Sequence, residues 1–266
     1  TIRSAGDHKF TCSRETGNRI VVDGKGISPK ASINIYLNKV NINTSNGPAL
    51  QINVNVEATV TIYLTGTNNL ITKHTWYAGL QKVNTALLII TTNVSDTTAG
   101  ILNAHGSSDG DGAGIGGGLS GSCSNITIES CSVIASSNYG AGIGGGKQGA
   151  GSKITINSAS VTASSTGGAG IGGGLYGAGS GSDITINSSS VTASSTNGAG
   201  IGGGEGNSCE NITINSSSVT ASSTNGAGIG GGYEYGGSCK NITINGGSVK
   251  ASSVSGSPTN EGKEVY

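Results

Sequence analysis

Charged side chains are scarce in this sequence: they make up 11% of the 266 residues, and 14 Lys and Arg balance 14 Asp and Glu. A protein that binds nucleic acid carries a clustered basic surface, so this composition argues against DNA or RNA as a partner. No apolar run approaches the length of a bilayer span, and no basic amphipathic helix is visible. The sequence therefore predicts no nucleic-acid partner and no membrane span.

Proline and methionine are also scarce, with three Pro and no Met. Glycine is abundant at 49 residues, but the few prolines and the lack of a strict Gly-X-Y step exclude collagen. The absence even of an initiator Met is typical of a processed mature protein or an excised fragment, from which a targeting segment can have been removed. No segment has a 3.6-residue apolar period, so we expect little or no helix.

Repetition is what the sequence has instead. The heptapeptide Gly-Ala-Gly-Ile-Gly-Gly-Gly occurs five times unchanged, in steps of 28, 28, 30 and 28 residues. The copies begin at Gly112, Gly140, Gly168, Gly198 and Gly226. An Ile-Thr-Ile motif and a Ser-Val-X-Ala-Ser-Ser motif recur with the same spacing of 28 to 30 residues. Self-similarity at a fixed period of this length predicts a stacked repeat architecture.

Each repeat contains three short segments with strand character. Period-2 alternation turns Val191 and Ala193 inward and Thr192 and Ser194 toward water. Three strands and three bends per 28 to 30 residues make one coil of a parallel β-helix, with neighbouring coils paired strand on strand. The predicted fold is all-β, a single-stranded right-handed parallel β-helix, the hand following from the usual crossover rule.

The first 105 residues are less regular than the rest. Alternating apolar residues at Ile33, Ile35 and Leu37, and again from Leu50 to Val56, predict strands with one buried face. We expect residues 1–105 to form irregular coils of the same β-helix, with a separate N-terminal β-domain as the alternative. Residues 106–254 then form five regular repeats, and residues 255–266 a C-terminal cap or linker.

These residues resemble a family of extracellular β-helix repeat proteins from anaerobic gut bacteria and protists, often labelled adhesin-like or carbohydrate-binding. The resemblance covers most of the chain. It rests on Ile33-Asn-Ile-Tyr-Leu, Val60-Thr-Ile-Tyr-Leu-Thr-Gly-Thr-Asn-Asn-Leu, Tyr77-Ala-Gly-Leu-Gln and the repeated heptapeptide. It implies a secreted or surface-exposed protein, and it is more specific for fold than for function.

Three of the five cysteines share one position in the repeat, because Cys123, Cys209 and Cys239 each lie three residues before their Ile-Thr-Ile. Cys209 and Cys239 fall on adjacent coils, which places their Cα atoms about 5 Å apart and within disulfide range. The sequence predicts this disulfide, with buried free thiols as the alternative. For Cys123, pairing with Cys131, pairing with Cys12 and a free thiol all stay open.

Residues suited to catalysis or metal binding are few and scattered. Parallel β-helices often host polysaccharide lyases and hydrolases, which need clustered carboxylates or a Lys or Arg base beside them. Here two acids approach the same column of adjacent coils only near Glu205 and Glu234, in corner loops. Asp109-Gly-Asp111 is more typical of a turn than of a calcium site, and the three His lack a metal-type spacing. We therefore expect no enzyme activity, no cofactor and no metal.

Two candidate surfaces stand out. Aromatic residues recur near the glycine corners, and exposed rings can stack on sugars, although single aromatics that merely cover the corners are the favoured interpretation. The carbohydrate-binding candidates are Trp76, Tyr176, Tyr233 and Tyr235. The alternation also predicts an outward column of glycines, a bare strip for self-association, unless glycine serves only the backbone angles of a tight corner. These are Gly114, Gly142, Gly170, Gly200 and Gly228.

Outward hydroxyl groups form a third pattern. Thr162, Thr192 and Thr220, each with a Ser two residues later, predict a two-column array of the kind that ice binding needs, although Thr is also a common strand residue. Seven Asn-X-Ser/Thr sequons are candidate glycosylation sites. A chain so rich in Asn, Ser and Thr contains several sequons by chance, so their number alone is weak evidence for glycosylation. They lie at Asn43, Asn93, Asn125, Asn187, Asn211, Asn215 and Asn241.

The sequence as a whole predicts a non-catalytic structural or adhesive rod, secreted or held at the cell surface. Its regular faces would contact host, matrix or sister molecules. The leading alternative is a carbohydrate-binding module that uses the corner tyrosines, and ice binding through the Thr/Ser columns is a weaker alternative.

Overall fold

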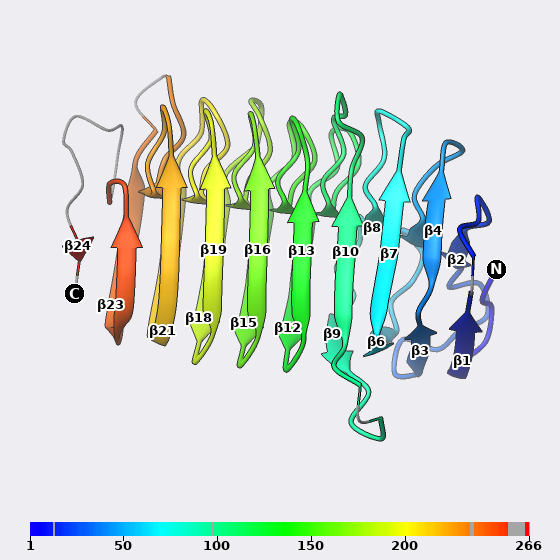
Figure 1. Ribbon diagram of the computed structural model, residues 1–266. Helices are drawn as coiled ribbons and strands as arrows, with labels where there is room; N and C mark the ends of the chain where they lie inside the picture. Colours follow the sequence, from blue (N-terminus) through cyan, green and yellow to red (C-terminus); the bar gives the residue numbers. More distant parts are fainter. Residues whose placement is uncertain (13, 97, 235–236, 255–263, 266) are drawn as a thin grey trace.

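The computed structural model is a parallel β-solenoid whose coils stack in a single row from the N- to the C-terminus (Figure 1). It describes residues 1–12, 14–96, 98–234, 237–254 and 264–265. No helix occurs within those ranges. The coils build three parallel faces, as the repeat motifs predicted, although the first coil has only an isolated bridge on the second face and the coil of β23 only one on the third.

The first face carries the Ile-Thr-Ile strands and the second the Ser-Val-X-Ala-Ser-Ser strands. The first face contains β1 (Gly6–Thr11), β3 (Ser32–Asn38), β6 (Thr59–Thr65), β9 (Leu88–Thr92), β12 (Cys123–Glu129), β15 (Gly151–Asn157) and β18 (Gly181–Asn187). The second contains β4 (Asn41–Thr44), β7 (Thr67–Thr72), β10 (Ile101–His105), β13 (Ser132–Ser136), β16 (Ser160–Ser165) and β19 (Ser190–Ser195). The long strands β21 (Cys209–Ser223) and β23 (Cys239–Ala251) run through both faces and join them into one sheet.

The third face is a separate sheet of short strands, which in the regular repeats come from the glycine heptapeptides. It contains β2 (Ile20–Val22), β5 (Leu50–Ile52), β8 (Leu80–Lys82), β11 (Ile115–Gly116), β14 (Ile143–Gly144), β17 (Ile171–Gly172), β20 (Ile201–Gly202) and β22 (Ile229–Gly230). The last described strand, β24 (Glu264–Val265), pairs antiparallel with β23. The other residues of the predicted C-terminal cap or linker lie outside the described chain.

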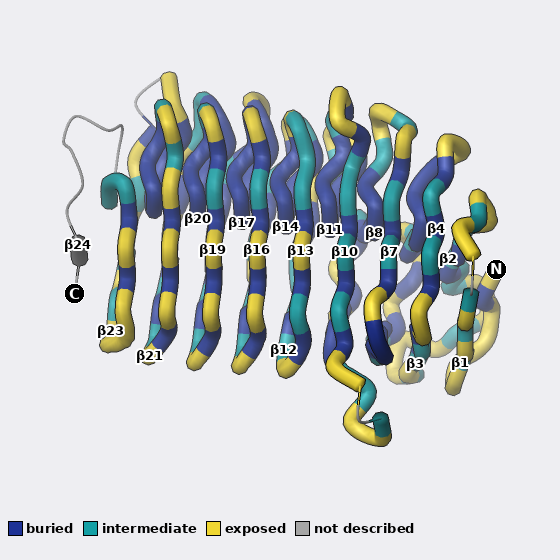
Figure 2. Tube along the Cα trace, in the orientation of Figure 1, coloured by how far each residue is buried: buried dark blue, intermediate teal, exposed yellow. Residues whose placement is uncertain are grey.

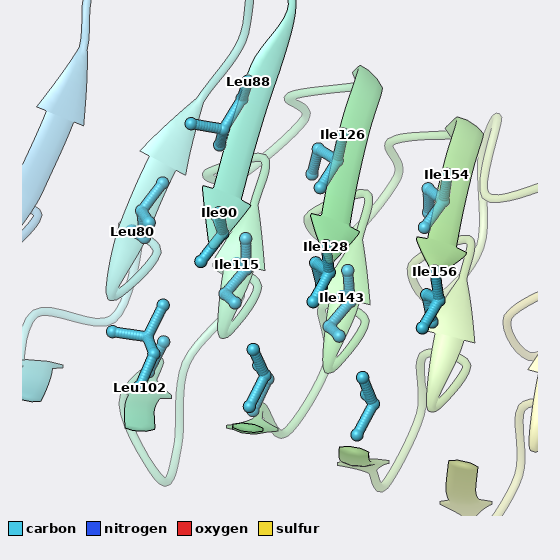
Figure 3. Close-up of a cluster of buried hydrophobic side chains, with 14 of the residues drawn as sticks. Leu80, Leu88, Ile90, Leu102, Ile115, Ile126, Ile128, Ile143, Ile154 and Ile156 are labelled. Carbon is cyan, nitrogen blue, oxygen red and sulfur yellow. The ribbon is translucent and has the colours of Figure 1, made fainter. Parts of the chain in front are cut away.

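Identical residues stack in register from coil to coil. Ile154 pairs with Ile184 and Ile184 with Ile212, and all three side chains are fully buried. Figure 3 shows such ladders filling the space between the faces, with Ile126 beside Ile154 and Ile128 beside Ile156. Each buried isoleucine contributes about 1.5–3 kcal/mol of burial free energy, so the ladders hold the coils together.

A left-handed residue makes the bend between the first and second faces. Ser130, Ser158, Ser188 and Ser216 all have φ between +47° and +52°. A second left-handed position precedes each Ile-Thr-Ile, with φ between +51° and +57°, at Asn125, Lys153, Asp183, Asn211 and Asn241. Asn and Asp visit this conformation more readily than other non-glycine residues, which explains most of this second column, and here their side chains bond to a neighbouring coil, as Asn211 does to Asp183 at 2.9 Å.

The glycine heptapeptide folds into a compact loop rather than a regular strand. The N–H of Ala113 donates to the carbonyl of Gly117 at 2.8 Å, and the other four copies repeat this bond. The fifth residue of each copy, such as Gly116 at +135°, has a φ between +133° and +151°, which only glycine adopts readily. Ala113 and Ile115 enter the core as predicted, but the residue between them does not face outward.

The predicted bare strip is therefore wrong. Gly114, Gly142, Gly170, Gly200 and Gly228 are all buried. A Cβ atom on any of them would lie 2.5 to 2.7 Å from a backbone oxygen. At Gly170 the nearest groups are the carbonyl of Gly200 at 2.6 Å and the amide of Ser194 at 2.8 Å. These glycines let the corner loop pack against the backbone of the second face, and they offer no surface to a partner.

The irregular N-terminal coils share the sheets of the regular repeats, because β9 pairs with β12 and β8 with β11. Strand β1 is the first strand of the first face. The sequence does not indicate it, because its inward residues, Gly6, His8 and Phe10, do not form an apolar alternation. The predicted inward position of Val54 is wrong: β5 ends at Ile52, and Val54 lies in a turn with 73% of its surface exposed.

One cation lies inside the N-terminal core. Lys82 continues the inward column of Val22 and Ile52 and is fully buried. Its Nζ donates to the carbonyl oxygens of Asn84 at 2.8 Å and Ser124 at 2.6 Å. Burial lowers the pKa of Lys82, because desolvation disfavours the charged amine.

We expect replacement of this lysine to change the pH dependence of stability. Between the lowered folded pKa and the ordinary value of 10.5, the unfolded chain binds more protons, so wild-type stability rises with pH there. Lys82→Met lacks this contribution, so the free energy of unfolding of the variant minus that of wild type should fall with rising pH, by up to about 1.4 kcal/mol per pH unit. Urea unfolding of both proteins across this range measures the difference, and a constant difference would contradict the assignment.

The predicted disulfide is present between Cys209 and Cys239, whose Cα atoms lie 4.4 Å apart on the paired strands β21 and β23. Cys12, Cys123 and Cys131 are free thiols, which settles the alternatives that the sequence left open. Burial raises the pKa of Cys123 to about 11 and that of Cys131 to about 12, so both thiols are poorly reactive in the folded chain.

Candidate binding surface

Large apolar side chains are exposed on the connections at both ends of the third face: two lie between the second and third faces, and three between the third and the first. We call this set the corner row; it consists of Trp76, Leu119, Tyr139, Tyr176 and Tyr233. Their exposed fractions run from 36% for Tyr139 to 56% for Trp76. Exposed residues gather at these corners, whereas the third face is buried throughout the regular repeats (Figure 2).

The corner row follows the solenoid axis. Trp76 and Tyr139 hold the same position in coils two apart, four residues before the equivalent Leu80 and Ile143. Tyr176 and Tyr233 come four or five residues after Ile171 and Ile229, again two coils apart. The row extends from the coil of β8 to that of β22, five steps of roughly 4.8 Å, or about 24 Å in all.

Backbone hydrogen bonds between coils hold the row in place. The amide of Leu119 donates to the carbonyl of Trp76 at 2.8 Å, and that of Leu175 donates to Tyr139 at 2.9 Å. The backbone amide of Tyr176 donates to the backbone carbonyl of Glu205 at 3.0 Å, and the amide of Tyr233 donates to the carbonyl of Asn197 at 2.7 Å. The rings therefore project from a paired backbone, so binding a ligand need not order the backbone that carries them.

Polar groups are interleaved with the rings. The carboxylate of Glu205, 8% exposed, accepts hydrogen bonds from the Tyr176 hydroxyl at 3.0 Å and from the Asn197 amide at 2.8 Å. Lys147 pairs with Asp111 at 3.1 Å, and its ammonium lies 5.0 Å from the centre of the Tyr139 ring. Rings alternating with fixed donors and acceptors can contact both the apolar and the hydroxylated surfaces of a ligand.

A cleft of about 410 Å³ opens at the N-terminal end of the row. Trp76, Tyr77, Val83 and Leu119 supply apolar walls, and Gln81 supplies an amide. Tyr77 and Trp76 both contact the His74 ring, at centroid distances of 4.5 Å and 5.6 Å. Of the predicted carbohydrate-binding residues, Trp76, Tyr176 and Tyr233 are exposed on the connections that flank the third face, and Tyr235 lies outside the described residues.

The hydroxyl columns lie on the second face. Thr162, Thr192 and Thr220 are paired in register and exposed, with Ile134 before them and Lys250 after them in the same column. The geometry of the predicted array is therefore present over three coils. Ice binding through it stays a prediction.

All seven sequon asparagines use their side-chain amide nitrogen in a hydrogen bond of 2.7 to 3.4 Å. Asn187 and Asn215 belong to an outward ladder in which Asn157, Asn187, Asn215 and Asn245 bond one to the next. Asn211 and Asn241 are exposed. Glycosylation of these residues stays a prediction, and the ladder gives the amides a role in holding coil register.

The described residues gather little that could do chemistry. Within those ranges, no three His, Cys, Asp or Glu side chains come together as metal ligands. Nδ1 of His105 lies 2.6 Å from Oγ of Ser136, and burial lowers the pKa of His105. In the described chain, no recorded hydrogen bond joins His105 to the carboxylate that a catalytic triad would need. Nor does that part of the chain hold a helix long and apolar enough to cross a bilayer.

Sequence reasoning missed a second group of side chains, on the outer surface of the first face near the N-terminus. Tyr36 and Tyr63 are paired in register and stack with ring centroids 4.7 Å apart. The Lys9 ammonium lies 5.7 Å from the centre of the Tyr36 ring. The signal was present in the sequence, because Ile-X-Ile-Tyr-Leu occurs at Ile33 and, as Val-Thr-Ile-Tyr-Leu, at Val60.

Five segments of the chain match a protein-family model described as Beta helix repeat: residues 126–147, 154–175, 184–205, 212–233 and 242–257. Each segment begins at an Ile-Thr-Ile strand, and the first four extend past a glycine heptapeptide. No curated protein and no solved structure matches the chain. The match and the stacked coils agree that the protein is built from beta-helix repeats.

Proposed function

We propose that the protein is a non-catalytic, extracellular adhesive rod that binds polymeric glycans along its corner row. The observation that carries this proposal is the exposure of four aromatic rings and Leu119 on connections that backbone hydrogen bonds join from coil to coil. Soluble proteins seldom leave large apolar groups exposed together unless the surface meets a partner. The length of the row favours an extended polymer over a single sugar.

The chemistry of the row supports a saccharide in particular. Aromatic rings accept the apolar C–H face of a sugar, and the fixed Glu205 and Asn197 groups beside Tyr176 can meet its hydroxyls. Since the rings stand on hydrogen-bonded coils, the surface is preorganised for a rigid, extended chain.

An extracellular location is supported by the Cys209–Cys239 disulfide, since such bonds persist mainly in oxidising compartments. The seven sequons are compatible with the same location. The partners proposed here are therefore glycans of a host or matrix surface, with no nucleic acid.

Affinity electrophoresis against a panel of soluble neutral polysaccharides tests the proposal. We expect at least one polymer to retard the wild-type protein, and the triple variant Trp76→Ala, Tyr176→Ala, Tyr233→Ala to lose at least about tenfold in affinity. Truncating one exposed ring alone should weaken binding by a smaller factor.

Ile134→Ala is the matched control, because Ile134 is an exposed large apolar residue on the second face, away from the row. It should bind as wild type does. Equal retardation of wild type and the triple variant, or no retardation by any polymer in the panel, would contradict glycan binding by the corner row.

Self-association is the second candidate, and the same exposed row favours it, because an apolar line can also dock on a sister molecule. The glycine strip no longer supports it. Negative-stain electron microscopy over a concentration series separates the two roles. Rods that join at high concentration in wild type but not in the triple variant would make assembly the function of the row, whereas isolated rods at every concentration would exclude assembly by this chain alone.

A further inference from the structure

A second cleft lies at the N-terminal end of the solenoid, on the outer surface of the first face, with a volume of about 470 Å³. Strands β1 and β3 form one side of it, and the connection from β9 to β10 forms the other. That connection projects beyond the other turns at the same edge of the sheet (Figure 1). Six of the lining residues carry the argument: Asp7, Lys9, Tyr36, Asn38, Asn93 and Asp96.

The aromatic wall of this cleft is fixed. Tyr36 lines the cleft and stacks on Tyr63 at an interplanar angle of 14°, because β3 and β6 pair in register. Lys9 lies over the Tyr36 ring from the neighbouring coil. A ring packed in this way keeps one orientation, so its hydroxyl and exposed edge are held ready for a ligand.

The two carboxylates are also held in place. Oδ1 of Asp7 accepts a hydrogen bond from the Asn34 amide at 2.8 Å, and Oδ1 of Asp96 accepts one from the Thr98 backbone amide at 3.0 Å. A carboxylate has about four acceptor sites, so each retains capacity for further donors. The side chains of Asn38 and Asn93 add amide donors and acceptors to the same cleft.

We propose that this cleft binds a neutral or amino-bearing sugar unit, independently of the corner row. Its volume falls in the range of small-ligand sites, about 300–1,000 Å³. Adjacent sugar hydroxyls donate to carboxylates in charge-assisted hydrogen bonds. The asparagine amides and the tyrosine hydroxyl can both donate hydrogen bonds to sugar hydroxyls and accept them.

The charges of the lining decide between classes of sugar. Two carboxylates face one ammonium, so an acidic sugar meets net repulsion and an amino sugar net attraction. The density of charged and amide groups argues against a lipid or another apolar ligand, which would leave these groups without partners.

Saturation-transfer difference NMR with the full chain tests this proposal. The probes are glucose, galactose, mannose, N-acetylglucosamine, glucosamine and glucuronic acid, together with disaccharides of the neutral members. We expect saturable binding of at least one neutral or amino sugar and weaker binding of glucuronic acid.

Two variants connect the binding to the cleft. The double change Asp7→Asn, Asp96→Asn preserves shape and should weaken binding at least about tenfold, because it removes both charged acceptors. Tyr36→Phe keeps the stack on Tyr63 but removes the hydroxyl, and should weaken binding about fivefold. Far-ultraviolet circular dichroism and the unfolding midpoint confirm that both variants fold.

The corner-row triple variant is the control that keeps the two sites distinguishable. It should retain wild-type affinity for the small sugar even if it loses polysaccharide binding. The proposal is overturned if no probe saturates, if the cleft variants bind as wild type does, or if glucuronic acid binds most tightly. It is overturned as well if the triple variant alone abolishes sugar binding, because the sugar then occupies the corner row.

Discussion

Gly170→Ala is expected to destabilise the protein by about 3 kcal/mol or more, although it adds a single methyl group. The new Cβ would lie 2.6 Å from the Gly200 carbonyl, 2.8 Å from the Ser194 amide and 2.9 Å from the Ala163 carbonyl. All three groups are backbone atoms: Ser194 and Ala163 lie in the paired strands β19 and β16, and the Gly200 carbonyl accepts a hydrogen bond from the Ile171 amide at 3.0 Å. None can move without breaking bonds between neighbouring coils. Urea unfolding of the variant and wild type measures the loss.

Gly17→Ala is the matched control, because its Cβ would meet nothing nearer than the Asn43 carbonyl at 3.9 Å. We expect a change within about 0.5 kcal/mol there. A Gly170→Ala protein as stable as wild type would mean that the heptapeptide glycines tolerate side chains, and would restore the outward strip. The same geometry makes Gly200→Lys an unsuitable probe of assembly, since loss of folding would precede any effect on association.

The regular coils could be predicted because repetition supplies the register directly. Three copies of one phrase, such as those with Val161, Val191 and Val219, must occupy one column if coils stack, and alternation then separates core from surface. The same logic predicted the Cys209–Cys239 pair from the sequence. The register, once known, fixes contacts that single-sequence patterns leave open.

The structure of the glycine corner could not be predicted in the same way, because alternation gives side-chain directions only in a pleated strand. Each heptapeptide contributes two strand residues, such as Ile115 and Gly116, and then a φ of +135° at Gly116 breaks the pleat. With no Cβ atoms to indicate direction, the sequence could not show that Gly114 packs against the second face. The repeated glycines were visible, but the reason for them was a close backbone approach.

Two N-terminal features, the buried lysine and the cleft at Tyr36, could not be predicted from the sequence. Lysine is rarely buried without a partner, so nothing in a single sequence indicates that Lys82 continues the column of Ile52. The cleft at Tyr36 depends on β1 and on the loop that contains Asp96, which are far apart in the sequence and which only the fold brings together. By contrast, the corner row was partly predictable, because aromatic residues recur beside the glycine heptapeptides, whose positions the repeats make clear.

Loss of the Cys209–Cys239 disulfide should release the last coil while leaving the middle of the solenoid intact. That coil is weakly packed: Ile242 and Ile244 are only partly buried, whereas Ile212 and Ile214 one coil earlier are fully buried. The bond closes a loop with a sequence separation of 30 residues, which in the chain-entropy account stabilises the closed coil by about 3–4 kcal/mol. Since each coil contacts only its neighbours, the loss stays local.

Hydrogen exchange under native conditions measures this effect strand by strand. In the double variant Cys209→Ser, Cys239→Ser, we expect amide protection in β23 to fall by about two orders of magnitude, while β15 exchanges as in wild type. Cys12→Ser, which removes a thiol but no crosslink, should leave both strands unchanged. Unchanged protection of β23 in the double variant would show that strand pairing with β21 alone fixes the last coil, and equal loss in β15 would show that the solenoid opens as one cooperative unit.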